Sequence, residues 1–351
     1  FDKARLVDNY RCFRAALPTV AIHYAVKCLS DSSVLNTLLA QGSHFEIAST
    51  RELDLLLAQG VKPQHILYSN PIKSPAAIRY AADRGVQWYA VDSTDELLKI
   101  AAITPDARCY LRIHTSNDGA MWPLEEKFGA RRREIDAILS TAAEHRVQLV
   151  GVTFHVGSQC LNPDNWRRGI RTARAVFEAM KALGITAQLL NIGGGFPAAI
   201  GSDVPTIETI AAVINEELAA LDPQLKVVAE PGRYLVASAG CLVCRVIGTA
   251  VRSGQRWLYL DTGTYGGLME MAEGFRYPMI TERRGAVADW TVAGPTCDAV
   301  DICSKQVSLP VDLQSDDFVY IVYAGAYTIT SASTFNGFAK PRLIAFDSRS
   351  G

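Results

Sequence analysis

Short apolar runs alternate with longer helical patterns over the first two thirds of the chain. In the longer stretches apolar residues recur every three or four positions, which is helical spacing. This alternation is typical of repeated βα units, in which each strand is followed by a helix. The β-like runs are Ala21–Val26, Phe45–Ala48, Ile66–Tyr68, Trp88–Val91, Cys109–Ile113, Leu149–Phe154, Leu189–Ile192 and Val227–Ala229. Eight units predict an α/β fold with a closed (β/α)8 TIM-like barrel, because closure leaves no edge strand unpaired.

The pattern changes after Pro231. Short alternating runs separated by Gly, Asp and Pro replace the helical stretches, which predicts an all-β domain. These runs are Leu235–Gly248, Arg256–Leu260, Thr291–Gly294, Phe318–Val322 and Arg342–Asp347. We therefore expect a barrel domain over residues 1–234 and a C-terminal β domain over residues 235–351.

Composition excludes several classes of protein. The 351 residues are 49% hydrophobic and 20% charged, as in a soluble globular protein. Lys and Arg number 35 against 36 Asp and Glu, so no basic surface indicates nucleic acid, and no apolar run approaches the roughly 18 residues of a membrane span. The eight cysteines are scattered, which fits reduced thiols in the cytoplasm. The one Cys-x-x-Cys, at Cys241 and Cys244, has no second pair, so we expect no metal.

Chemistry-bearing side chains follow the predicted strands. The active sites of such barrels lie at the C-terminal ends of the strands, so these residues are candidates for one site. They are Lys27, Glu46, Ser49, Arg112, His155, Gly193, Gly194, Gly195, Glu230 and Arg233.

Each candidate also has a structural interpretation. Lys27 can be a solvated strand-end lysine, and the three glycines can simply make a turn. With Arg233 nearby, however, the glycines indicate a phosphate site after the late strands of the barrel. Glu230 can pair with Arg233 or lie beside a ring nitrogen, and His155 can be structural or stack on a flat cofactor. Together they predict pyridoxal phosphate, held by Lys27 as a Schiff base.

Six motifs in order extend this prediction over nearly the whole chain. They are Tyr24–Cys28, His155–Ser158, Gly193–Pro197, Glu230–Tyr234, Gly294–Asp298 and Gly325–Thr328 with Ser333–Phe338. These motifs resemble the ornithine/diaminopimelate decarboxylase family, the fold-type-III pyridoxal-phosphate decarboxylases with an alanine-racemase-like fold. The resemblance implies a decarboxylase that releases CO2 from the α-carbon through a quinonoid intermediate.

The resemblance assigns roles to individual residues. Lys27 would carry the cofactor, His155 would stack on its ring, and Glu230 would hold the ring nitrogen. The phosphate would be held by Ser158, Gly193, Gly194, Gly195, Arg233 and Tyr327, with Glu46, Glu52, Arg112 and Lys127 near the cofactor. Cys297, which would protonate the α-carbon, and Asp298 would reach into the active site of the other subunit of a homodimer. The chain begins partway into the family pattern, which implies that a strand of the β domain precedes residue 1.

The segment that would contact the distal end of the substrate departs from the family pattern. Glu273 and Gly274 replace the Tyr-Asp pair of diamine-forming members, Arg276 follows, and Asn191 replaces an Asp. A pocket with one carboxylate fewer and an added arginine suits an anionic substrate, such as the citrate-conjugated 2,3-diaminopropionate of siderophore biosynthesis. The alternative is ornithine or lysine decarboxylation for polyamine biosynthesis, with Glu270 or Glu273 binding the ammonium group. An amino-acid racemase and a catalytically inactive regulatory homologue are the remaining alternatives.

Overall fold

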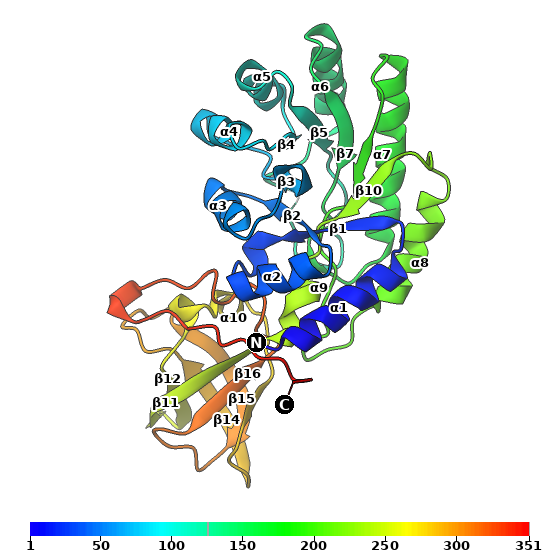
Figure 1. Ribbon diagram of the computed structural model, residues 1–351. Helices are drawn as coiled ribbons and strands as arrows, with labels where there is room; N and C mark the ends of the chain where they lie inside the picture. The colour runs from blue at the N-terminus through cyan, green and yellow to red at the C-terminus, as the bar shows by residue number, and fades with distance from the viewer. Residues whose placement is uncertain (125, 351) are drawn as a thin grey trace. The chain divides into compact units, whose positions relative to one another are not determined.

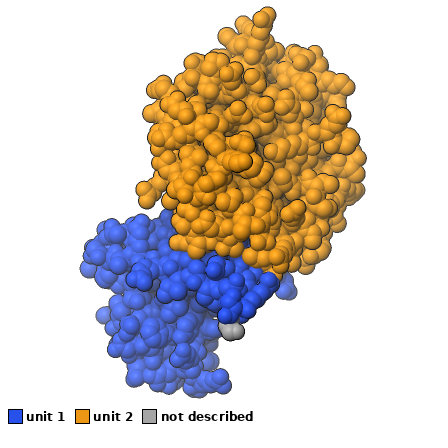
Figure 2. Space-filling view, in the orientation of Figure 1, with its two compact units in different colours: residues 1–6, 198–203, 233–351 blue, residues 7–197, 204–232 orange. Residues whose placement is uncertain are grey.

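The computed structural model describes residues 1–124 and 126–350, which form two compact units. The barrel unit comprises Val7–Pro197 and Val204–Gly232. The sheet unit comprises Phe1–Leu6, Ala198–Asp203 and Arg233–Gly351, of which Gly351 lies outside the described residues (Figure 2). Within the described residues, no helix has the length and the apolar character needed to cross a membrane.

Eight parallel strands close the barrel in the order β1-β10-β9-β7-β5-β4-β3-β2 (Figure 1). The predicted barrel is confirmed, and every strand boundary lies within one residue of its predicted position. The strands are β1 (Val20–Ala25), β2 (His44–Ile47), β3 (Ile66–Tyr68), β4 (Trp88–Val91), β5 (Arg108–Arg112), β7 (Leu149–Thr153), β9 (Leu189–Asn191) and β10 (Lys226–Ala229).

Helices cover the outside of this ring. The helices are α2 (Ser32–Ala40), α3 (Thr50–Ala58), α4 (Pro75–Ala82), α5 (Thr94–Ile103), α6 (Arg132–Glu144), α7 (Asp164–Ala182) and α8 (Ile207–Leu218), while α1 spans Lys3–Ala16. Most begin at a short polar N-cap whose side chain accepts a backbone N–H of the first turn, which ends the preceding loop. These caps are Asp31, Ser49, Ser74, Ser93 and Thr206.

Buried side chains fill the interior of the barrel. Leu67, Trp88, Tyr110 and Val228 belong to one core cluster contributed by four different strands. The barrel is therefore a packed core, and ligands are confined to its ends. Short elements lie in the loops: η1 (Val26–Cys28), η2 (Pro63–His65), and the paired strands β6 (Ala120–Trp122) and β8 (Ser158–Cys160).

The sheet unit contains six strands in the order β13-β16-β11-β12-β14-β15. They are β11 (Cys241–Arg252), β12 (Gln255–Leu260), β13 (Met279–Thr281), β14 (Val287–Ala293), β15 (Ile302–Pro310) and β16 (Phe318–Val322). Short helical elements accompany them: α9 (Arg233–Val236), η3 (Ala237–Ala239), η4 (Thr264–Gly266), α10 (Met269–Ala272) and η5 (Phe335–Gly337).

Two of the strand predictions in this unit differ from the structure, one at its start and one throughout. The run Leu235–Gly248 starts as helix, because Leu235 and Val236 are both fully buried in α9, and its strand begins only at Cys241. The run Arg342–Asp347 is not a strand: Ile344 is 70% exposed and only Phe346 makes a bridge, to Asp2. Alternation without a buried face does not form a strand.

Candidate active site

A cavity of about 760 Å³ lies in the barrel unit and is lined by residues that follow its strands. It brings together six of the residues predicted from the sequence and adds several that sequence reasoning did not place. The predicted six are Lys27, Glu46, Arg112, Lys127, His155 and Glu230, and the others include Ser69 and Phe128. The parallel strands explain this grouping, because their C-terminal ends meet at one end of the barrel.

Lys27 presents its amine to this cavity. It lies in η1, just after β1, and its Nζ is 2.6 Å from Oε2 of Glu46. The registry of β1 with β2 places Ala25 opposite Glu46, which brings the two side chains together. Glu46 is 2% exposed, whereas the Lys27 side chain is 43% exposed. The lysine is therefore anchored to a buried carboxylate yet open to a ligand, unlike a freely solvated strand-end lysine.

Glu230 is a buried carboxyl group at the end of β10. Its Oε1 accepts hydrogen bonds from Ser69 Oγ at 2.5 Å and from Asn191 Nδ2 at 2.6 Å. Its Oε2 makes no hydrogen bond to any of the residues the structure describes. Burial raises the pKa of Glu230 to about 7, and the nearby charge of Glu46 acts in the same direction. A proton on Oε2, or a cationic ring nitrogen beside it, would offset the energetic cost of burying this negative charge.

Ser69 is a site residue that sequence reasoning missed. It directly follows β3, so its place at a strand end was the available signal. Its hydroxyl also hydrogen-bonds the hydroxyl of Tyr110, at 2.8 Å. Asn191, noted in the sequence only as a departure from Asp, holds Glu230 without adding a second negative charge.

His155 is held as a neutral imidazole. Its Nδ1 accepts a hydrogen bond from the backbone N–H of Gly157 at 3.0 Å, so Nε2 carries the proton. Burial lowers the pKa of His155 well below its ordinary value, and the positive charge of Arg112 adds to this effect. Burial also lowers the pKa of Arg112, whose charge is favoured by Glu230.

The three glycines pack closely against the end of β7 and against Glu230. A Cβ atom at Gly193 would lie 2.1 Å from the Phe154 carbonyl oxygen, and one at Gly194 would lie 2.7 Å from that of Glu230. Gly195 has φ +92°, which favours glycine. The amide groups of Gly194 and Gly195 donate no hydrogen bond within residues 1–124 and 126–350. Two unpaired backbone amides after a strand can bind a phosphate. Ser158, another predicted phosphate ligand, begins β8 three residues after His155.

The other predicted site residues belong to the sheet unit. There Arg233 is 4% exposed, and its two terminal nitrogens bind the carboxylate of Glu270 at 2.8 and 2.6 Å. The Tyr277 hydroxyl donates to the same carboxylate, and Arg233 lies 4.9 Å from the ring centre of Tyr327. The guanidinium of Arg233 is therefore paired with Glu270, whereas the structural alternative considered from the sequence paired it with Glu230. Tyr277 was not predicted from the sequence.

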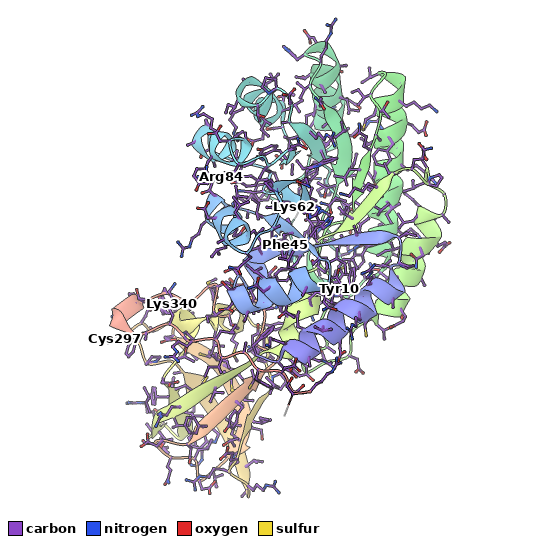
Figure 3. The ribbon with its side chains drawn as sticks, viewed as in Figure 1. Tyr10, Phe45, Lys62, Arg84, Cys297 and Lys340 are labelled. Carbon is purple, nitrogen blue, oxygen red and sulfur yellow. The ribbon has the colours of Figure 1, made fainter. Side chains whose placement is uncertain are left out.

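The remaining candidates lie at the surface of the sheet unit or on its short helix α10. Cys297 is exposed in the loop after β14 (Figure 3), and its backbone N–H donates to Asn336 Oδ1. Asp298 Oδ2 accepts from the Tyr265 hydroxyl at 2.6 Å. Arg276 donates to backbone carbonyl oxygens at 3.4 and 3.3 Å, and Glu273 ends α10.

The barrel site has the donor set that pyridoxal phosphate requires. Lys27 offers an amine, Glu230 a carboxyl oxygen without a hydrogen-bond partner, and the glycine loop two unpaired amides. Among the described residues, no group of three His, Cys, Asp or Glu side chains is arranged to hold a metal ion. The barrel, the lysine after its first strand and the accompanying sheet unit define the class of fold-type-III pyridoxal-phosphate enzymes.

Comparison with known proteins identifies the family within this class. Residues 3–237 match the family described as pyridoxal-dependent decarboxylase, pyridoxal binding domain. The chain is 36% identical to ornithine decarboxylase from Rattus norvegicus, in an alignment that covers 99% of this chain and 80% of that protein. The chain belongs to the pyridoxal-dependent decarboxylase family, and it is a pyridoxal-phosphate-dependent carboxy-lyase.

Solved structures agree with this assignment. The structure superposes on a lysine/ornithine decarboxylase from Vibrio vulnificus, complexed with cadaverine, with a TM-score of 0.92 at 36% sequence identity. This alignment covers 99% of the present chain and 93% of the Vibrio chain. The arginine decarboxylase of Paramecium bursaria Chlorella virus superposes with a TM-score of 0.93 at 30% sequence identity. The alignment covers 98% of the present chain and 94% of the viral chain.

Proposed function

We propose that this enzyme decarboxylates ornithine or lysine to the corresponding diamine, a reaction of polyamine biosynthesis. The observation that carries the proposal is the barrel cavity, where the amine of Lys27 is anchored by Glu46 and a carboxyl group of raised pKa, Glu230, faces the same space. The names of the relatives, which act on ornithine, lysine or arginine, support the substrate class.

Barrel residues would hold the cofactor at defined points. Lys27 would bind it covalently through its amine, Glu230 would accept a hydrogen bond from the protonated ring nitrogen, and His155 would lie against the ring. Gly194 and Gly195 would donate their amides to the phosphate, and Ser158 would add a hydroxyl. Arg233 and Tyr327, both in the sheet unit, are proposed as further phosphate ligands.

Pyridoxal phosphate, when bound, supplies an electron-withdrawing ring that accepts the electron pair released as CO2 departs. The protein's own residues hold and deliver the protons that the reaction needs. Glu230 keeps a proton at the ring nitrogen, since its buried carboxylate is stabilised by that positive charge. Cys297 is proposed to return a proton to the α-carbon, a task suited to a thiol.

Contacts in the sheet unit favour a cationic distal group on the substrate. The alternative, a citrate-conjugated substrate of siderophore biosynthesis, relied on Arg276, but this side chain donates to carbonyl groups at the end of α10. Glu270 neutralises Arg233, so it is not the partner of the substrate ammonium group. We propose Glu273 for that role, with Asp298 as a second acidic contact.

Parallel assays of 14CO2 release test the substrate. Ornithine and lysine are expected to give the highest kcat/KM among ornithine, lysine, arginine and a citryl-diaminopropionate conjugate. Glu273→Gln is expected to raise KM for ornithine, while Glu282→Gln on the same unit leaves it unchanged. Preferential turnover of the citryl conjugate would overturn the proposed substrate. Cofactor binding without CO2 release from any of them would point to the regulatory homologue.

We also propose a homodimer in which Cys297 and Asp298 complete the active site of the partner subunit. The exposure of Cys297 and of the neighbouring Phe335, which is 42% exposed, supports a contact surface in this region. A cytoplasmic location remains a prediction, which the free cysteines support.

A further inference from the structure

The N-terminal end of the barrel carries three clustered histidines that the proposed function does not use. His44 begins β2 and His65 immediately precedes β3, and their rings stack with centroids 4.2 Å apart and planes 7° apart. His23 lies opposite His44 in the strand registry, with its ring centroid 4.9 Å away. The cluster therefore lies at the end of the barrel opposite to the Lys27 cavity.

Two permanent cations flank the histidines. Lys226 is the first residue of β10 and Arg108 the first of β5, and both are exposed. Both approach the indole of Trp88, with Lys226 Nζ 5.9 Å and the Arg108 guanidinium carbon 5.2 Å from the ring centroid. The positive charge of Lys226 contributes to lowering the pKa of both His23 and His44, and the charge of Arg108 contributes to lowering the pKa of Lys226. Residues at or near the N-terminal ends of six adjacent strands, in the order β10, β1, β2, β3, β4 and β5, thus contribute to one positively charged rim.

No carboxylate among the described residues neutralises the two cations of this rim. Among the described residues, neither Lys226 nor Arg108 forms an ion pair or a hydrogen bond through its side chain. The Nδ1 atoms of His23, which is 1% exposed, and of His44 are buried and have no hydrogen-bond partner. Buried polar atoms without partners are rare in native proteins, and an ordered water or an ion is their usual partner.

A cavity of about 260 Å³ opens beside His44. It is lined by Tyr10 (Figure 3), Arg14 and the segment Thr19–Ile22, among others, and none of its lining residues is acidic. Arg14, like Lys226, has no ion pair within the described part of the chain. A third unpaired cation therefore lies next to the histidine cluster.

We propose that this N-terminal rim of the barrel is a binding site for a phosphate dianion, separate from the cofactor site. Arg108 and Lys226 supply two permanent positive charges, which match a dianion, and guanidinium and ammonium groups both bind phosphate well. A metal ion does not explain the cluster, because nearly parallel stacked rings do not direct their nitrogens toward one point.

Isothermal titration of inorganic phosphate into the holoenzyme tests the site. Saturation with pyridoxal phosphate keeps the glycine loop occupied, and sodium chloride at matched ionic strength controls for screening. The double variant Arg108→Gln/Lys226→Gln removes two charges from the rim. Its matched control, Arg174→Gln/Lys181→Gln, removes the same two charges from the exposed surface of α7.

We expect phosphate to bind the holoenzyme, with Kd weakened at least about tenfold in the rim variant and unchanged in the control. Lys226→Arg is expected to retain binding, and CO2 release is expected to be the same in all variants. Glycerol phosphate in place of phosphate distinguishes a metabolite phosphate group, which both probes would reveal, from a free ion, which only the inorganic probe would reveal. Absence of binding beyond the chloride control, or equal Kd in the rim and control variants, would overturn the proposal.

Discussion

Replacing Glu230 with Gln should stabilise the apoprotein and disable the enzyme. The carboxyl group is 8% exposed, and burial raises its pKa from 4.5 to about 7. As the pH rises, the unfolded chain loses this proton before the folded protein does, so Glu230 destabilises the fold progressively from pH 4.5 upward, up to a plateau above pH 7. Gln keeps an oxygen for the hydrogen bonds from Ser69 and Asn191 but carries no charge.

The magnitude follows from the difference between the two pKa values. A difference of about 2.5 units corresponds to about 3 kcal/mol at pH 8, and the part developed by pH 5 is about 1 kcal/mol. Urea unfolding of the cofactor-free protein at both pH values, at one protein concentration, measures it. The free energy of unfolding of Glu230→Gln should exceed that of the unmodified protein by these amounts. With cofactor bound, the same variant should lose on the order of 10²- to 10³-fold in kcat, because the charge that holds the ring proton is absent.

Glu178→Gln on the exposed face of α7 is the matched control, and we expect no pH-dependent change in its stability. A Glu230→Gln variant that is less stable than the unmodified protein, or whose gain is equal at pH 5 and pH 8, would refute the reasoning.

Two further predictions concern the dimer and the glycine loop. Mixing equal amounts of inactive Lys27→Ala and inactive Cys297→Ala subunits should restore up to about a quarter of the activity, because about half of the dimers are then mixed and one of the two sites in each mixed dimer is intact. No recovery after subunit exchange would contradict a shared site. Gly195→Ala should weaken cofactor affinity and cost at least about 1–3 kcal/mol in urea unfolding, because its Cβ would lie 2.3 Å from the Gly157 carbonyl oxygen. Gly184→Ala, with φ +74° and open space around it, is the control for backbone strain alone, and an equal loss in both variants would exclude the steric cause.

The barrel could be predicted from the sequence because each strand is a short, mostly apolar run that ends in a polar residue or is followed by one within two positions. The same regularity brought Lys27, His155 and Glu230 to one cavity, since residues after parallel strands meet at one end of a barrel. Ser69 could not be singled out, because its role depends on reaching across the barrel to Glu230, a contact between residues 161 positions apart.

The sheet unit was less predictable for a related reason. Its strands are defined by long-range pairing, and the exposed run around Ile344 alternates without finding a partner. The partner of Arg233 was also left open by the sequence, with Glu230 as one candidate. Glu230 is close in sequence, but Glu270, which is 37 residues away, reaches the guanidinium with both carboxylate oxygens.

The most direct test of the account is to identify the lysine that carries the cofactor. Reduction of the holoenzyme with sodium borohydride makes the bond between the lysine and the cofactor permanent, and peptide mass spectrometry locates it. The account predicts a pyridoxyl phosphate adduct on Lys27, absent from Lys27→Ala, which should also lose CO2 release. An adduct on another lysine, or unchanged CO2 release by Lys27→Ala, would contradict it.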